Sequence, residues 1–129
     1  MHTLEPLCNL EQSTILKELG FAEEVRIAFI MEFEWERETC SMWDNYNDDA
    51  ETISCPTISM AMNWVFREYG IWIYAMPHLK SKGIEYDFTG LAKHKDGAVT
   101  RIFDYPDPHT AESECLTEIL KHLKNKSND

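Results

Sequence analysis

The chain has 129 residues, with 12 Lys and Arg against 23 Asp and Glu, and therefore a formal net charge of −11 at pH 7. Its 43% hydrophobic and 12% aromatic content is typical of a folded globular chain, and its length predicts a single domain over residues 1–129. The negative balance excludes a stand-alone binder of nucleic acid or of an anionic membrane, because both need a positive surface.

The negative charge is concentrated in the first half of the chain. Residues 1–60 hold 13 acidic and 3 basic residues, whereas residues 61–129 hold 10 and 9. The segment from Glu23 to Glu51 alone holds ten acidic residues against two arginines. A charge so unevenly placed predicts an acidic face, which either binds a basic partner or serves only to keep the protein in solution.

We expect the protein to be cytoplasmic. The start of the chain lacks a cationic stretch followed by a long apolar run, so no secretory signal is predicted. The longest mostly apolar stretch, Ile71–Pro77, is far shorter than the roughly 20 residues that span a bilayer. The spacing of Cys8, Cys40, Cys55 and Cys115 fits neither paired zinc ligands nor a redox Cys-x-x-Cys motif. Reduced, buried thiols are therefore expected, and the sequence leaves a disulfide open.

The first half predicts one helix and two strands. Asn9 and Gln12 form a capping-box pattern before a short helix that ends at Gly20. Residues 25–36 alternate strictly between apolar odd positions and largely charged even positions, which predicts one long strand from Val25 to Glu36. Thr39–Tyr46 is expected to pair back against it. The acidic segment Asp44–Glu51 then predicts a turn, and Thr52–Cys55 a brief extended segment.

The second half predicts two helices around three strands. Thr57 is a suitable N-cap for a helix over Ile58–Tyr69. An apolar stripe on this helix contains Ile58, Ala61, Met62, Val65, Phe66 and Tyr69, and leaves Met60 and Trp64 outside, where we expect them to be exposed. The strands are expected at Ile71–Met76, Ile84–Leu91 and Ala98–Tyr105, with turns at Lys82-Gly83 and Asp96-Gly97. A last helix is expected from Thr110 onward, burying Cys115, Leu116, Ile119, Leu120 and Leu123.

The order is therefore α-β-β-α-β-β-β-α. The short connections between the last three strands require antiparallel pairing, because parallel neighbours need a crossover. These elements predict an α+β fold with a mostly antiparallel sheet of about five strands and three helices packed mainly on one face.

Two segments carry a resemblance. LKELGF at 16–21 and PTISMAMNWVFREYGI at 56–71, followed by three strands and an Ala/Glu-rich closing helix, resemble small uncharacterised α+β accessory proteins of phages and mobile elements in Bacteroides-type gut bacteria. The resemblance consists of core and cap positions, so it implies no catalytic or ligand-binding residue. The acidic segment lies outside the matched pattern and is particular to this chain.

The sequence contains no recognisable catalytic motif. The five histidines lack a metal-binding spacing, and neither a nucleophile elbow nor a glycine-rich phosphate loop is present. The acidic turn has Ala50 where a calcium loop needs glycine. We therefore expect no catalytic residue, no metal and no cofactor. The alternative is a small metal-dependent hydrolase or phosphoesterase using Glu32, Glu34 and Glu36 as a carboxylate row on one strand face.

The charge pattern favours a non-catalytic module that binds a basic protein surface. A phage-encoded inhibitor or nucleic-acid mimic acting on a basic host or defence protein would have this pattern, and it would not bind nucleic acid directly. A self-associating accessory protein, in the simplest case a homodimer, is a further alternative. The residues expected to contact the partner are Glu32, Glu34, Glu36, Glu38, Asp44, Asp48, Asp49, Glu51 and Trp64.

Overall fold

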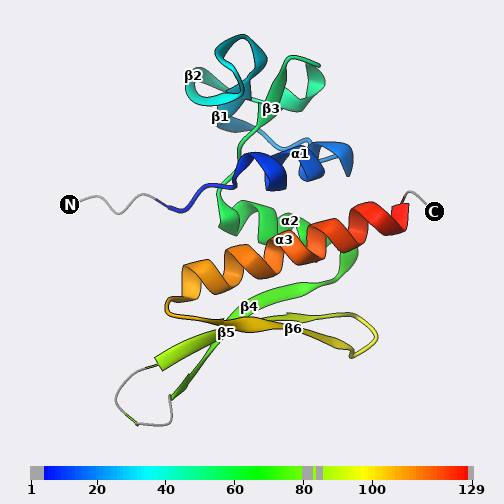
Figure 1. Cartoon of the computed structure of the whole chain (residues 1–129). Helices are drawn as coiled ribbons and strands as arrows, with labels where there is room; N and C mark the ends of the chain where they lie inside the picture. Colours follow the sequence, from blue (N-terminus) through cyan, green and yellow to red (C-terminus); the bar gives the residue numbers. More distant parts are fainter. Residues whose placement is uncertain (1–4, 80–82, 84–85, 128–129) are drawn as a thin grey trace. The chain divides into compact units, whose positions relative to one another are not determined.

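The computed structural model describes residues 5–79, 83 and 86–127 (Figure 1). The chain divides into two compact units: unit 1 comprises Met1–Ala61 and Leu120–Asp129, and unit 2 comprises Met62–Ile119. Each unit contains one antiparallel sheet of three strands, in the orders β2-β1-β3 and β4-β5-β6. The α+β class is therefore confirmed, although the strands form two sheets rather than one. A single domain over 1–129 stays a prediction.

Unit 1 begins with the helix that the capping box predicts. In α1 (Leu10–Glu18) the Asn9 side chain accepts a hydrogen bond from the Gln12 amide at 2.8 Å, and the Gln12 side chain accepts one from the Asn9 amide at 2.9 Å. Phe29, Ile53 and Cys55 form a buried cluster in unit 1. Three partly buried residues pack against this cluster: Leu7, Ile27 and Trp35. This cluster holds β1 (Val25–Ile30) and β3 (Thr52–Ser54) in place.

The long strand predicted from Val25 to Glu36 is wrong. The chain leaves β1 after Ile30, makes a 3₁₀ turn at Met31–Phe33 and returns as β2 (Glu36–Asp44). The alternating pattern of apolar residues continues through this turn, but the apolar side chains there have different environments. Trp35 packs against the buried cluster, whereas Met31 and Phe33 are about half exposed. Apolar residues at odd positions therefore have two different environments here, which periodicity alone does not separate.

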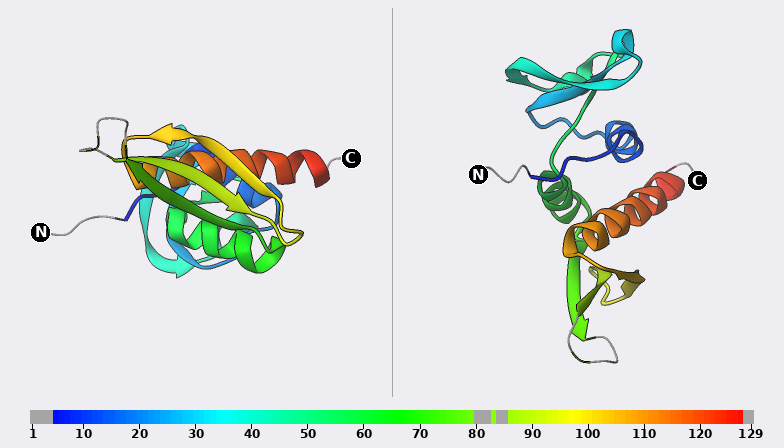
Figure 2. Two further views of the ribbon diagram at one scale, coloured as in Figure 1. Left: turned by 90° about the horizontal axis from the view of Figure 1, so that it is seen from below. Right: turned by 60° about the vertical axis from the view of Figure 1, so that its left-hand side comes forward.

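Unit 2 contains the second sheet, formed by β4 (Trp72–Leu79), β5 (Tyr86–Lys93) and β6 (Val99–Tyr105). Residues 84 and 85, where the middle strand was expected to begin, and Lys82 of the first turn lie outside the described residues. The parts of α2 (Ile58–Tyr69) and α3 (Pro108–Ser127) that belong to unit 2 lie over one face of this sheet, and the sheet stands in front of them when viewed from below (Figure 2, left). Among the residues of unit 2 that the structure describes, no helix lies on its other face.

The contact between α3 and this sheet is close at one glycine. A Cβ atom placed on Gly90 would lie 2.6 Å from the Ala111 carbonyl oxygen and 3.0 Å from the Cys115 Cβ. The five residues expected to be buried on the last helix are all buried. The helix begins at Pro108 rather than Thr110, because Asp107 is its N-cap: the Thr110 amide donates to the Asp107 carboxylate at 2.8 Å, which with the Thr110 hydroxyl lowers the pKa of that carboxyl.

The expected exposure of Trp64 is wrong. Its side chain is only 6% exposed, whereas Phe66 is 50% exposed. The buried face of α2 runs through Ala61, Trp64 and Val65, so it is rotated toward Trp64 from the face that the apolar stripe indicates. The Trp64 ring meets the Tyr69 ring edge-on at a centroid distance of 5.8 Å. An indole offers more apolar area to a core than the residues that the stripe placed there.

The four cysteines are free thiols, of which Cys8, Cys55 and Cys115 are buried and Cys40 is half-buried. Burial raises the pKa of Cys115 to about 12 and also raises the pKa values of Cys8 and Cys55. Within the described part of the chain, no helix is long and apolar enough to cross a membrane.

Candidate protein-interaction surface

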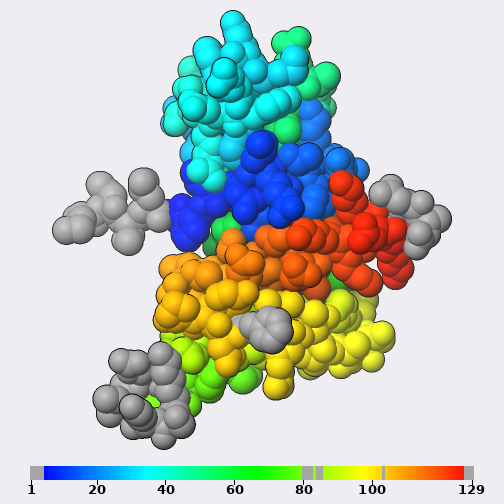
Figure 3. All heavy atoms as spheres, in the orientation of Figure 1, coloured from blue at the N-terminus to red at the C-terminus, as the bar shows by residue number. Residues whose placement is uncertain are grey.

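The eight acidic residues expected to bind a partner all lie in one segment of unit 1. They occupy the β1–β2 turn, strand β2 and the turn that follows it, and each is exposed: Glu32, Glu34, Glu36, Glu38, Asp44, Asp48, Asp49 and Glu51. We call residues 31–51 the acidic hairpin. Its residues are drawn mainly in cyan in the space-filling view, where they lie at the surface (Figure 3). All eight carboxylates are therefore exposed within one continuous segment of the chain.

The tip of the acidic hairpin has an unusual backbone. Glu34 and Trp35 both have left-handed conformations, with φ values of +57° and +61°. The Glu34 amide donates to the Met31 carbonyl at 3.1 Å, and the Trp35 amide donates to the Ile30 carbonyl at 2.9 Å. A left-handed conformation costs roughly 1–2 kcal/mol for a residue with a Cβ atom. The packing of Trp35 against the buried cluster helps to hold the turn in this shape.

This turn removes the predicted carboxylate row. Glu32 lies in the 3₁₀ turn, Glu34 in the left-handed position after it, and Glu36 is the first residue of β2. The three side chains therefore do not share one strand face, and the prediction that they do is wrong. A hydrolase that uses these three carboxylates as one row would need them on a single strand face, which this turn does not provide.

Strand β2 is an edge strand with a wide bulge. It pairs only with β1 in the order β2-β1-β3. Ile27 pairs with Thr39 but Val25 pairs with Asp44, so between these pairs one residue of β1 lies opposite four residues of β2. Within this bulge Met42 is 70% and Trp43 is 61% exposed. Bulges at sheet edges redirect side chains and interrupt pairing, and this one places two large apolar side chains in solvent among the carboxylates.

Hydrogen bonds hold the bulge in place. The Arg26 guanidinium donates to the Cys40 carbonyl at 3.3 Å and 3.2 Å, and the Tyr46 hydroxyl donates to the Met42 carbonyl at 2.5 Å. Desolvation first, and then the neighbouring Cys40 and Asp44, raise the pKa of Tyr46, so this phenol keeps the proton that it donates. The two carbonyl groups in the bulge thus have fixed partners.

The acidic turn after β2 is also fixed, through Asn47. Its side-chain amide donates to the Phe21 carbonyl at 2.8 Å, and its side-chain oxygen accepts from the Ser54 amide at 2.8 Å. The Thr52 hydroxyl donates to the Tyr46 carbonyl at 2.5 Å. Asp48 and Asp49 are therefore carried on a turn whose backbone is tied to β3 and to the segment before β1.

The basic side chains of this region bind the main chain. Between residues 5 and 61 they are Lys17, Arg26 and Arg37, and each donates to a backbone carbonyl group. The Lys17 ammonium donates to the Asp49 carbonyl at 2.6 Å and to the Thr52 carbonyl at 2.7 Å. The Arg37 guanidinium donates to the Cys8 carbonyl at 2.8 Å and lies 5.2 Å from the centre of the Phe29 ring. These three cations hold the fold of the unit, and the carboxylates face solvent.

The apolar part of the surface differs from the prediction. Trp64, expected to anchor a partner, is buried in unit 2, whereas Met42 and Trp43 are exposed within the acidic hairpin. Both residues belong to the predicted strand Thr39–Tyr46, in which alternate side chains are expected to pack on the sheet. Their exposure depends on the bulge, and the sequence carries no separate signal for it.

Comparisons with protein-family models, with curated proteins and with solved structures found no match to the chain.

Proposed function

We propose that this chain is a non-catalytic, cytoplasmic protein-binding module whose acidic hairpin docks on a basic surface of a partner protein. The observation that supports this most is the composition of that segment: residues 31–51 carry eight exposed carboxylates together with the exposed Met42 and Trp43. Concentrated negative charge speeds association with a positive surface. A large exposed aromatic side chain supplies the apolar contact that slows dissociation.

The backbone of the hairpin supports the same proposal. Glycine or asparagine would occupy the position of Glu34 without the cost of a left-handed conformation. A glutamate at φ +57° keeps a carboxylate at the tip of the hairpin instead. Strained residues of this kind are concentrated at functional positions. We infer that the charge at the tip is part of the binding surface.

The partner that fits best is the basic groove of a protein that handles nucleic acid. The module would occupy that groove as a nucleic-acid mimic, which is consistent with a phage-encoded inhibitor of a host or defence protein. It would not bind nucleic acid itself, because like charges repel. The open edge of β2 also leaves self-association through a homodimer as an alternative outcome.

The test is a pull-down with two variants of equal charge. The hairpin variant carries Glu→Gln at positions 32, 34, 36 and 38, and the control variant carries Glu→Gln at positions 5, 24, 68 and 114, which are exposed elsewhere. Each variant changes the net charge from −11 to −7. The baits are incubated with a gut-bacterial lysate at about 50 mM and about 500 mM salt, and bound proteins are identified.

The proposal predicts a basic protein that wild type and the control variant retain at low salt, that high salt releases, and that the hairpin variant does not retain. If both variants retain less of the partner than wild type does, and to the same extent, then net charge rather than the hairpin causes binding. A bait that retains no protein at either salt, or that sediments as a homodimer through β2, would reject the proposal.

A further inference from the structure

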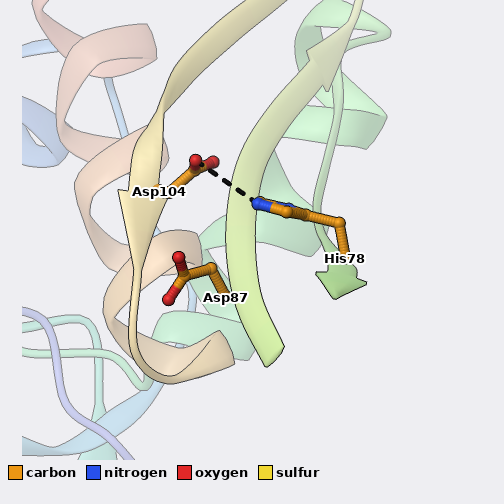
Figure 4. A group of neighbouring side chains, drawn as sticks. All are labelled: His78, Asp87 and Asp104. Atoms are coloured by element: carbon orange, nitrogen blue, oxygen red, sulfur yellow. Dashed lines mark ion pairs between the residues drawn. The ribbon is translucent and has the colours of Figure 1, made fainter. Parts of the chain in front are cut away.

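The helix-free face of the unit 2 sheet brings three metal-ligating side chains together. His78 is on β4, Asp87 on β5 and Asp104 on β6. The register pairs His78 with Asp87, and Asp104 with Thr89. Residues two apart on a strand lie on the same face, so these four side chains share one side of the sheet. Figure 4 shows the imidazole pointing toward the two carboxylates.

The distances between the ligand atoms suit a single cation. One ligand atom from each of His78, Asp87 and Asp104 lies within 4.8 Å of the others. His78 Nε2 is 3.4 Å from Asp104 Oδ2. Zinc binds imidazole nitrogen and carboxylate oxygen at about 2.0–2.2 Å, which separates two ligands of a tetrahedral ion by about 3.3–3.6 Å. The imidazole and the Asp104 carboxylate thus already have the required spacing.

Thr89 orients these two ligands. Its hydroxyl donates to Asp104 Oδ1 at 2.5 Å, and its oxygen is 3.3 Å from His78 Nδ1. Because the Thr89 hydroxyl donates its proton to the hydrogen bond with Asp104, its oxygen acts as the acceptor of a hydrogen bond from His78 Nδ1–H. When the imidazole is protonated, Nε2 and Asp104 Oδ2 form an ion pair; when Nε2 carries no proton, as metal binding requires, its lone pair faces Asp104 Oδ2. A cation between the two atoms satisfies both, and a hydrogen bond to the outer atom of a ligand is the usual way a metal site fixes its histidine.

The same side chains border a hollow of about 530 Å³. His78, Thr89 and Asp104 line it together with Met76, Leu91 and Arg101. Three protein ligands leave at least one position of a four-coordinate ion to water or to a small ligand. The hollow gives such a ligand access, and Arg101 favours one with negative charge.

We propose that His78, Asp87 and Asp104 bind one divalent transition-metal cation, for which Zn²⁺ is the best fit. A mixed set of imidazole and carboxylates favours Zn²⁺ over Mg²⁺ and Ca²⁺, which prefer sites made entirely of oxygen ligands. The site lies in unit 2 and does not depend on the proposed role of the acidic hairpin. Its failure and the failure of that role are therefore separate results.

Isothermal titration of the full chain, freed of metal by dialysis against a chelator, tests the site. ZnCl₂ should bind with one strong equivalent, and MgCl₂ should not compete at equal concentration. His78→Ala and Asp104→Asn should each weaken zinc binding by at least about tenfold, and Thr89→Val by about 10–100-fold through loss of orientation.

His122→Ala and Glu68→Gln, which remove an exposed imidazole and an exposed carboxylate elsewhere, should leave the affinity unchanged. Lowering the pH from about 7.5 to about 5.5 should weaken binding, because protons compete for the imidazole.

Two results would overturn the proposal. The first is the absence of a saturable zinc equivalent, or an equivalent of equal affinity in wild type, His78→Ala and Asp104→Asn. The second is a thiolate charge-transfer band when Co²⁺ replaces Zn²⁺, because that band would place the ion on a cysteine. Circular dichroism of each variant checks that the fold is retained. We expect it to be retained because the His78 and Asp104 side chains are 42% and 50% exposed.

Discussion

Substituting Asn47 by alanine should destabilise unit 1 more than is usual for a substitution in a turn. The change removes the donor to the Phe21 carbonyl and the acceptor for the Ser54 amide. Ser54 is 1% exposed, so water does not readily replace the lost acceptor. Leaving a buried amide without a partner costs about 1–3 kcal/mol, and the second hydrogen bond contributes about 1 kcal/mol. We therefore expect the free energy of unfolding to fall by about 2–4 kcal/mol.

Urea unfolding followed by tryptophan fluorescence measures this loss. Asn47→Asp keeps the acceptor for Ser54 but places a carboxylate against the Phe21 carbonyl, so its stability should lie between those of Asn47→Ala and wild type. Asn125→Ala, at an exposed helical position of the same unit, is the matched control and should leave stability within about 0.5 kcal/mol of wild type. An Asn47→Ala variant as stable as this control would refute the idea that the Asn47 side chain fixes the acidic turn.

Three further predictions concern other positions. Gly90→Ala should lower stability by about 1–3 kcal/mol in thermal unfolding, because its Cβ would lie 2.6 Å from the Ala111 carbonyl oxygen, and an unchanged melting temperature would contradict the close approach of α3. Glu34→Gly should raise stability by about 1 kcal/mol by relieving the left-handed conformation, and a loss of stability in urea would contradict this reasoning. The pKa of Cys115 is about 12 when folded against 9.0 for a free thiol, so the unfolded chain loses this proton first and stability should fall as the pH rises from about 9 to 12. Cys115→Ala should flatten that slope in pH-dependent denaturation, and Cys40 should be the first thiol to react with a disulfide reagent at pH 8.

The parts of the fold that the sequence predicted well are those with local physical signals. The Asn9–Gln12 capping box, the Asp96-Gly97 hairpin and the apolar face of the last helix are each found as expected. In each case the signal and the structure that it specifies lie within a few residues of one another. The exposure of the acidic residues also follows from the residue types themselves, since carboxylates are rarely buried without partners.

The errors arise where distant contacts decide the local structure. The 3₁₀ turn after Ile30 depends on Trp35 packing against β1 and β3, and an alternating pattern is compatible with either a turn or a longer strand. The exposure of Met42 and Trp43 depends on the register shift between β1 and β2. Neither contact can be read from the order of the residues.

The metal-ligating group on the second sheet was only partly accessible to sequence reasoning. A two-residue turn centred on Lys82-Gly83 places His78 opposite Asp87 in an antiparallel hairpin, as the register confirms, so this pair could have been predicted. By the same rule a two-residue turn centred on Asp96-Gly97 places Asp104 opposite Thr89; the observed turn is one residue longer, and the register shift between Thr89 and Gly90 restores this pairing. A search for histidine spacings along the chain misses ligands that come from three strands.

In the proposed function the acidic hairpin carries the electrostatic contact with a basic partner. The most direct test of this contact is the association rate constant for the recovered partner, measured by stopped flow for wild type, the hairpin variant and the equally charged control variant across about 50–500 mM salt. We expect association of wild type and the control variant to slow steeply as salt rises, and the hairpin variant to associate slowly and with little dependence on salt. Equal rates and equal salt dependence for the two variants would contradict the claim.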